Sequence, residues 1–346
     1  MYLSADTLDD LLRDVLARLL KSRTRVGATR GPSTELSGVL LKLRNPRARL
    51  SITERRCRIS SCLGELLWYL SKSNSLRFIK YYVKEYSANS DDGKTIFGAY
   101  GPRLFNMRNH DQIANVITLL RKKPESRRAV IQLFNAEDLV GHRKEIPCTS
   151  TLQFMIRRGR LNLLTSMRSN DAYKGLPHDV FAFTMLQEIL ARTLGVDLGT
   201  YKHSVGSLHL YESDRAGAQQ FLDEGWQPSD TAMPAMPLGD PWPSVRLLVK
   251  AEARVRRGGD AGHLKRELRP FWQDLLRLLE IYFHFTRNDA PAMTRVKRQL
   301  STQRYDSYID RKKSLADRRR AASEGRPPFP EQLSLLPKKR ERGAIE

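Results

Sequence analysis

The sequence predicts a mixed α+β fold in which several strands contribute to one sheet. Stretches with helical apolar spacing occur together with short runs typical of strands, and the runs at 149–156 and 161–167 flank RRGR, a hairpin signal. The predicted helices are 7–21, 57–71, 112–123, 180–194 and 264–285. The predicted strands are 37–51 (a strand or hairpin), 129–135, 149–156, 161–167 and 201–211.

The individual elements follow from local signals. Asp6 is the expected N-cap of the first helix, and residues 57–71 form an apolar helix that carries one acid, Glu65. Beyond residue 250 the chain becomes helical and basic, with a loop or frayed helix at 251–263. The sequence therefore predicts three parts, which are a catalytic domain at 1–250, a basic helical extension at 251–322 and a flexible tail at 323–346.

Composition limits the functional classes. The chain of 346 residues has a net charge of +22, which invites a nucleic-acid partner or a phosphorylated small molecule. No apolar run is long enough for a membrane span, and no signal-peptide pattern opens the chain. Three cysteines are a sparse, odd set, so we expect a reducing cytosol. Metal spacings such as CxxC or HExxH are absent, as are phosphate-binding glycine motifs.

Cys148 is the candidate nucleophile. It follows a proline at the start of a predicted strand, and Arg168 at the end of the paired strand could hold it as thiolate. A lone cysteine is more often an inert buried thiol. Cys57 and Cys62 lie on a helix with no cationic partner in the sequence pattern, so we interpret both as structural.

Glu65 is the candidate proton carrier, because a buried acid should have a raised pKa. The alternative is a helix whose polar side includes one Glu. Arg30, Arg127 and Arg128 are candidate phosphate ligands, although loop arginines usually face water. His209 and Tyr211 share one side of a strand, as a binding pair or as an ordinary half-buried pair.

The stretch RSNDAYKGLPHDV, residues 168–180, gathers charged groups around one glycine and one proline. It is too polar for a core strand and too broken for a helix interior, so we expect a rigid turn. Its last acid is Asp179.

The order of these motifs resembles thymidylate synthases and the related hydroxymethylases. The matching pieces are Arg30 in its loop, RRCRISSCLGELLWYL, GAYGPR, SRR at 126–128, PCT at 147–149, RSNDAYKGLP and GSLHLY, over roughly residues 5–250. The resemblance implies an α/β sandwich built on a twisted mixed sheet. It also implies an obligate homodimer formed through that sheet.

The resemblance also implies roles, residue by residue. Cys148 adds to C6 of a pyrimidine nucleotide, and C5 then attacks the one-carbon unit of 5,10-methylenetetrahydrofolate. Glu65 and Tyr100 handle protons. The phosphate is bound by Arg168, Ser169 and Arg30 and, from the partner subunit, by Arg127 and Arg128. His209 and Tyr211 bind the sugar, and Asp171 and Arg55 bind the folate.

Asp179 stands where thymidylate synthases carry asparagine, and it favours cytosine. Cytosine presents an amino donor at N4 and an acceptor at N3, whereas uracil presents the reverse edge. An aspartate accepts from N4 and, with one shared proton, satisfies N3. The alternative is drift to a related side chain. The implied substrate is therefore dCMP or CMP.

Other departures favour hydroxymethylation. Thr149 replaces a histidine that is usual in the family, Lys174 replaces a usually apolar residue, and Ser207 replaces a usual acid. In addition, the chain continues into a basic extension where the family has a tail that closes over the folate. Poorer closure would admit water to the intermediate. A second hypothesis is thymidylate synthase itself, acting on dUMP. A third, of another class, is a nucleic-acid-binding or scaffold protein that reuses the fold and contacts its partner through the basic extension.

Overall fold

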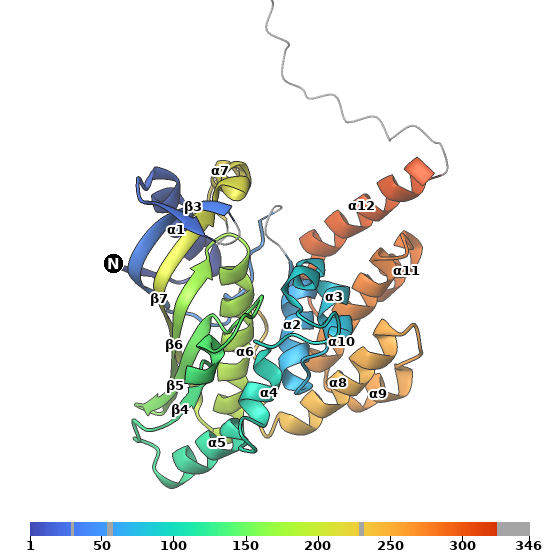
Figure 1. Ribbon diagram of the computed structural model, residues 1–346. Coiled ribbons are helices and arrows are strands. Elements are labelled where there is room, and N and C mark those ends of the chain that lie inside the picture. The colour runs from blue at the N-terminus through green and yellow to red at the C-terminus, as the bar shows by residue number, and fades with distance from the viewer. Residues whose placement is uncertain (29–30, 54–57, 228–231, 324–346) are drawn as a thin grey trace, which may run out of the picture.

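The fold is centred on one mixed sheet. The computed structural model describes residues 1–28, 31–53, 58–227 and 232–323. Within these ranges seven strands run in the order β1-β3-β7-β6-β5-β4, with β2 paired to β3. The pairs β1–β3 and β6–β7 are parallel and the others antiparallel. The predicted α+β class with a twisted mixed sheet and flanking helices is confirmed (Figure 1).

The strands are β1 Tyr2–Ala5, β2 Arg25–Ala28, β3 Gly31–Leu43, β4 Val130–Gln132, β5 Thr149–Arg157, β6 Arg160–Asp171 and β7 Asp197–Tyr211. The helices of the first part are α1 Leu8–Lys21, α2 Ile59–Leu70, α3 Leu76–Tyr82, α4 Tyr100–Phe105, α5 Gln112–Lys122, α6 Gly175–Leu194 and α7 Arg215–Asp223. The later helices are α8 Trp242–Arg256, α9 Gly262–Glu267, α10 Pro270–Phe285, α11 Ala290–Lys297 and α12 Asp306–Ser323. Short 3-10 turns are η1 Lys84–Asn89, η2 Ala136–Leu139 and η3 Glu212–Asp214.

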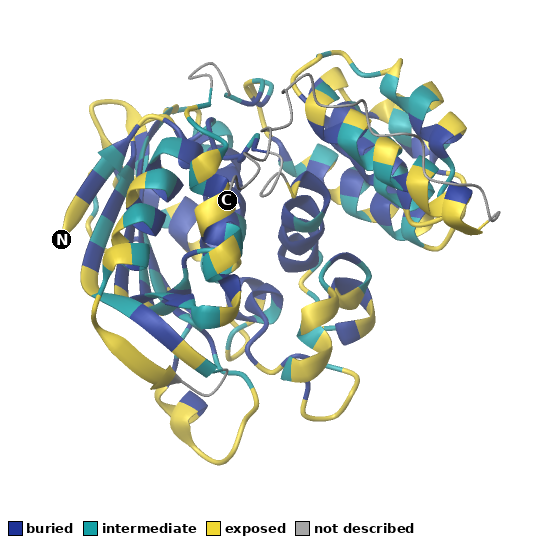
Figure 2. Cartoon of the chain, turned by 90° about the horizontal axis from the view of Figure 1, so that it is seen from above, coloured by how far each residue is buried: buried dark blue, intermediate teal, exposed yellow. Residues whose placement is uncertain are grey.

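The molecule is layered around α2. Helix α6 packs on β6 and β7, α2 packs on α6, and α10 packs on the other side of α2. Figure 1 shows these layers in sequence, from the sheet through α6 and α2 to α8 and α10. Ser61 is half-buried and the other eleven residues of α2 are buried, so this helix lies inside the molecule (Figure 2). An acid on α2 is therefore an acid in the core.

The helices after residue 241 share the hydrophobic core of the sheet region. Tyr82 on α3 donates to Glu252 on α8 at 2.8 Å, and the hydroxyls of Ser60 on α2 and Tyr308 on α12 are hydrogen-bonded. The predicted boundary at residue 250 falls inside α8, and the division into domains remains a prediction. None of the helices in the described residues is long and apolar enough to cross a bilayer.

The sheet face away from α6 is open. Along β5 and β6 the residues facing α6 are buried, and the alternate residues are half-buried. The half-buried set is Thr151, Gln153, Met155, Asn162, Leu164 and Ser166. Period-two alternation of this kind marks a sheet with one covered face. This open face is available to another surface.

Several sequence predictions are corrected. Thr7 caps α1, accepting from the amide of Asp10 at 3.1 Å, while Asp6 binds Arg44. The segment expected as a loop or frayed helix at 251–263 begins with the last turns of α8. The single helix expected at 264–285 is broken, because a residue before proline is pushed out of helical geometry.

Candidate active site

Cys148 and Arg168 lie side by side at the end of the β5–β6 pair. The backbone amide of Arg168 donates to the Cys148 carbonyl at 2.9 Å, which fixes the strand register. The guanidinium donates to the carbonyl of Pro147 at 2.9 Å and lies 3.7 Å from the Cys148 sulfur. A fixed cation beside a partly exposed thiol favours the thiolate, the form that acts as a nucleophile.

Tyr100 lies next to this thiol, at the start of α4. Its hydroxyl accepts from the backbone amide of Thr149 at 3.0 Å. Burial raises the pKa of Tyr100 well above its ordinary value, and the charges of Cys148 and Asp179 raise it further. Tyr100 is therefore a neutral phenol close to both the nucleophile and the acid on α6. These three residues share one site.

Glu65 points into the same site from α2. It accepts from the hydroxyls of Tyr69 at 2.9 Å and Tyr86 at 2.5 Å, and its second oxygen lies 3.3 Å from Nδ1 of His178. Burial raises the pKa of Glu65, but His178 and the two phenols lower it by more, so the net shift is downward. The expected rise in pKa is therefore wrong, because two phenol donors and the nearby imidazole compensate the carboxylate for lost water.

Asp179 is the second buried acid, in the second turn of α6. Asn170 on β6 donates to its Oδ2 at 2.5 Å. Burial raises the pKa of Asp179 to about 7, and the charge of nearby Glu65 contributes to the rise. The stretch 168–180 is thus not a turn throughout. Strand β6 continues to Asp171, and α6 begins at Gly175 because proline is tolerated in a helix's first turn.

The residues predicted for phosphate and sugar lie at the ends of β6 and β7. Ser169 and Nδ1 of His209 are 3.4 Å apart. The His209 and Tyr211 rings meet edge to face with centroids 4.9 Å apart. The parallel register places His209 on β7 opposite Asp171 on β6. The polar residues at the end of β6 that follow Arg168 therefore lie beside His209 and Tyr211, the residues predicted to bind the sugar.

Asp171 is half-buried at the end of β6. Its Oδ1 accepts from the amides of Tyr173 and Lys174 at 2.8 and 2.9 Å, which builds the link into α6. Both bonds use the same oxygen, so Oδ2 can accept from a pterin. Lys174 pairs with Asp214 at 2.8 Å. An acid placed in this way suits a ligand that brings N–H donors to this side of the site.

The other predicted ligands lie elsewhere. Arg30 and Arg55 fall outside the described residues. Arg127 and Arg128 precede β4, whose Val130 is opposite Gln153 of β5. At about 3.4 Å per residue, continuing this register puts them roughly 24 to 27 Å along the strands from Cys148. They are too far to serve the site of their own chain.

Sequence reasoning missed four residues of the site. The missed residues are Tyr69, Tyr86, Asn170 and His178. Tyr69 lies one helical turn from Glu65, and Asn170 and His178 both lie within the highlighted stretch, so a signal was present. Cys62 is buried and its side chain is one of the groups that raise the pKa of His178, its structural role stays a prediction, and Cys57 lies outside the described residues.

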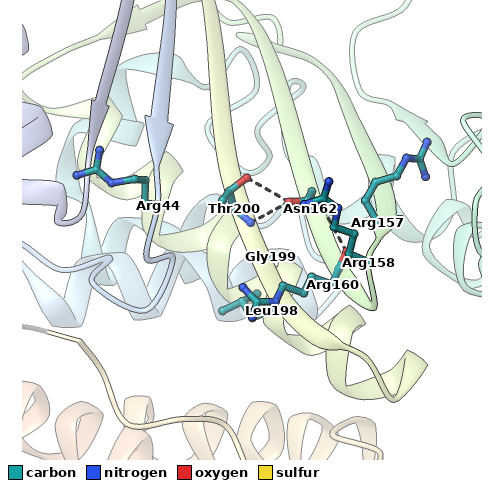
Figure 3. Close-up of a pocket in the computed structure, with 8 residues that line it drawn as sticks. All are labelled: Arg44, Arg157, Arg158, Arg160, Asn162, Leu198, Gly199 and Thr200. Atoms are coloured by element: carbon teal, nitrogen blue, oxygen red, sulfur yellow. Dashed lines mark hydrogen bonds between the residues drawn. The ribbon is translucent and has the colours of Figure 1, made fainter.

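An arginine-rich hollow lies at the far end of the hairpin. Its volume is about 520 Å³, and the RRGR turn forms much of its rim (Figure 3). Arg44, Arg157, Arg158 and Arg160 surround Asn162 and Thr200, which hydrogen-bond to each other. Arg157 is at the opposite end of β5 from Cys148. The hollow is therefore separate from the site.

Known proteins place this arrangement in a family. The model of a family described as thymidylate synthase matches residues 7–241. The chain belongs to the thymidylate synthase family. This family transfers a one-carbon unit to a pyrimidine nucleotide, and the matched region ends where α8 begins.

Two similar proteins refine the picture of this thymidylate synthase-family chain. The deoxyuridylate hydroxymethyltransferase of Delftia phage PhiW-14 is 29% identical over 265 residues, 69% of this chain and 72% of the relative. The crystal structure of thymidylate synthase from T4 phage superposes with a TM-score of 0.55 at 22% identity, covering 62% of this chain and 81% of the other. The second likeness shows the fold alone.

Proposed function

We propose that this protein hydroxymethylates C5 of a cytidine monophosphate nucleotide, dCMP or CMP, with 5,10-methylenetetrahydrofolate as donor. The observation that carries the base assignment is Asp179, a buried acid with a pKa of about 7. In its protonated form, which persists up to about neutral pH, it presents one hydroxyl donor and one acceptor oxygen. With the proton shared with N3 and the other oxygen accepting from N4, it pairs with the whole cytosine edge.

Uracil is the less favoured base. An ionised Asp179 would accept from N3–H but would face the lone pairs of O4. Asn170 already donates to Oδ2, so a proton on Asp179 belongs on Oδ1. With Oδ1 turned toward N3 of the base, as the proposal requires, this proton removes the freedom to swap donor and acceptor that a neutral acid otherwise has. A second candidate, hydroxymethylation of deoxyuridylate, is favoured by the name of the 29% identical relative.

The proposed mechanism assigns one task to each side chain. Cys148 adds to C6, so that a C–S bond forms and the C5=C6 electron pair makes C5 a nucleophile. Asp171 and, outside the described residues, Arg55 would hold the folate, which would supply a one-carbon unit at the oxidation level of formaldehyde. C5 bonds to that carbon as its bond to the folate nitrogen breaks, water adds to the carbon and gives the hydroxymethyl group, and Cys148 leaves C6 as thiolate. Glu65 accepts the proton that leaves C5, and Tyr100 donates hydrogen bonds near it. Arg168 binds phosphate and steadies the thiolate.

The decisive experiment measures tritium release and product together. Nucleotides tritiated at C5 (dCMP, CMP and dUMP) are incubated with methylenetetrahydrofolate, and the product mass distinguishes a hydroxymethyl from a methyl group. Release from a cytidylate with a hydroxymethyl product supports the proposal. Release from dUMP alone overturns the base assignment, with the product mass then separating the second candidate from a thymidylate synthase.

The base assignment has its own variant. Asp179→Asn should move preference from cytosine toward uracil by about 10- to 100-fold in kcat/KM, because one buried donor–acceptor pair is reversed. Equal losses for both bases would show that Asp179 does not choose the base. We expect the protein in a reducing cytosol, which remains a prediction from the cysteine content.

We propose a homodimer through the open sheet face, in which Arg127 and Arg128 of one copy reach the phosphate of the other. The support is the half-buried outer face and the distance from Arg127 to its own Cys148. A mixed-dimer test is direct. Cys148→Ser and Arg127→Gln/Arg128→Gln chains are each impaired alone, but co-refolding should restore activity. Donation within one chain predicts no recovery.

A nucleic-acid contact is the candidate of another class. Helix α8 exposes Arg246, Lys250 and Arg254 at successive turns, and Arg257 is exposed just after the helix ends. The buried Glu252 of α8 is bound by Tyr82 and Arg256. A row of cations spaced by one turn suits a phosphate backbone. Arg246→Glu/Lys250→Glu should abolish salt-sensitive DNA or RNA retention and leave turnover unchanged. Unchanged retention would overturn this candidate.

Deletion of residues 290–346 is a poorer test of that contact. Met293 on α11 and Ile309 on α12 belong to the core, and the hydroxyl of Tyr308 is bound by Ser60 on α2. Removing these helices would expose the core beside Glu65. Surface substitutions on α8 avoid this effect.

A further inference from the structure

His178 bridges the two helices that carry the acids of the site. It precedes Asp179 on α6, and its Nδ1 lies 3.3 Å from Oε2 of Glu65 on α2. Its Nε2 lies 3.0 Å from the Ser61 hydroxyl, also on α2. The imidazole is therefore held from both nitrogens by one helix while its backbone belongs to another.

Helix geometry directs the two neighbouring side chains of α6 apart. Successive residues of a helix project about 100° from each other. His178 turns to Glu65 on α2, and Asp179 turns to Asn170 on β6. Two buried acids that sense each other's charge thus have different partners, a cation for Glu65 and a neutral amide for Asp179. Acids separated in this way take opposite protonation states.

We propose that His178 is a positioning residue that holds Glu65 as an oriented carboxylate, the base of the site, while Asp179 stays neutral for the nucleotide base. This inference rests on the proposed function for its catalytic meaning. Burial lowers the pKa of His178, but Cys62 and Glu65 raise it to about 10, so the imidazole is a cation at neutral pH.

The groups that face this pair are identifiable. They are Ser61, Cys62 and Tyr69 on α2, Tyr86 on η1, Tyr100 on α4, Glu145 before β5 and Asp179 on α6. Only His178 among them is a cation. Removing it leaves Glu65 with two phenols and an acidic neighbour, and its pKa should rise because burial disfavours the charged form.

A merely structural pair would behave differently. Replacing a buried ion pair by apolar groups of similar volume is often neutral for stability. His178→Phe keeps an aromatic ring between α2 and α6, so thermal unfolding should change little. His178→Gln keeps a hydrogen-bond donor toward Glu65 without the positive charge, and Ser61→Ala removes the second contact of the imidazole alone.

The primary experiment is a pH titration of the carboxyl groups in the unliganded protein. The glutamate side chains are labelled with 13C, and NMR records their chemical shifts at each pH. The Glu65 signal is assigned with Glu65→Gln. In the native chain we expect Glu65 to stay ionised at pH values below the ordinary pKa range of a glutamate. In His178→Phe its pKa should be at least about one pH unit higher. The pKa in His178→Gln should lie between these two values, and the pKa in Ser61→Ala should be close to that of the native chain. Identical titrations in the native and Phe chains would overturn the proposal.

Kinetics supply the second readout. The kcat for tritium release should fall about 10- to 100-fold in His178→Phe with the nucleotide KM nearly unchanged, and the acid limb of the kcat–pH profile should move upward with the Glu65 pKa. His178→Gln should recover part of the rate. An unaltered pH profile in an active Phe chain contradicts the proposal. If the native chain releases no tritium from any nucleotide, the proposed function fails, and the carboxyl titration still decides the role of His178.

Discussion

Helix α6 carries a buried carboxylate toward each end, and the two carboxylates differ in their partners and in the direction of their pKa shift. Near the C-terminal end, Glu188 binds Arg47 at 2.8 Å, pairs with the fully buried Arg49 and accepts from the Met236 amide at 3.1 Å. Burial raises the pKa of Glu188, but the charges of Arg49 and Arg47 lower it by more. Near the N-terminal end, Asp179 has one amide donor and a pKa of about 7.

The comparison separates structural from chemical acids. Two guanidinium groups neutralise Glu188. Its role is structural, because it anchors the segment that carries Arg47 and Arg49 to α6. Among the described residues no cation forms an ion pair with Asp179, so we expect it to remain able to exchange a proton and to accept a ligand. A buried acid without its own cation costs stability, and such costs concentrate at functional sites. The four substitutions below test this division.

The largest effect should come from the nucleophile. Cys148→Ser removes the thiolate, and we expect turnover to fall by a factor on the order of 10³ or more, equivalent to about 4 kcal/mol. The free energy of unfolding should be unchanged within about 0.5 kcal/mol, because the side chain is only partly buried. Tritium release and denaturant melts measure the two quantities. Persistent release would remove Cys148 from the mechanism.

At the other end of α6, Glu188→Gln should lower the free energy of unfolding by about 3–5 kcal/mol, because it leaves Arg47 and Arg49 without their counter-charge. Urea denaturation measures this loss. The matched control is Glu212→Gln, which breaks the exposed pair with Arg25 and should cost less than about 1 kcal/mol. Equal losses would show that burial does not distinguish the two pairs.

A pH titration of stability tests Asp179. Its pKa is raised from 3.8 to about 7, so between these values the folded chain holds a proton that the unfolded chain has lost. Stability from this group is therefore complete below pH 3.8 and is lost as pH rises toward 7, by up to about 4 kcal/mol. Asp179→Asn should remove this component, making the variant more stable than the native chain at pH 8. A pH-independent difference would contradict the raised pKa.

The smallest effect should come from Thr149. Its side chain is fully buried, and within the described residues its hydroxyl makes no hydrogen bond of good geometry, although the Tyr100 phenol lies near it, so the isosteric Thr149→Val should stabilise the free protein by up to about 1 kcal/mol. Differential scanning calorimetry measures the shift. A fall in kcat/KM in the same variant would show that the hydroxyl serves the bound nucleotide; a loss of stability would show that it is satisfied by water.

The fold and the order of site residues could be predicted from the sequence because both depend on local patterns. Alternating apolar residues identified β5 and β6, and the flanking turn fixed their pairing, which brought Arg168 to Cys148. The protonation of Glu65 could not be predicted, because it depends on Tyr86 and His178. These residues lie 21 and 113 positions away in the chain and meet Glu65 only after α2 is buried.

The same limit explains the misjudged helix starts. Composition indicated turn chemistry at residues 168–180, but tertiary packing extended β6 to Asp171 and allowed α6 to begin at Gly175. Local propensity is a weak guide where a strand is stabilised by neighbours on both sides. The broken helix before Pro270, in contrast, follows from proline geometry and could have been read directly.

The hydroxyl contact between Ser60 and Tyr308 has a consequence for truncation. It joins the last described helix to a buried residue five positions before Glu65. Because a buried hydroxyl that loses its partner costs free energy, a chain shortened before α12 should lose stability at α2, the helix that carries Glu65. The terminal helices are therefore part of what keeps α2 in place.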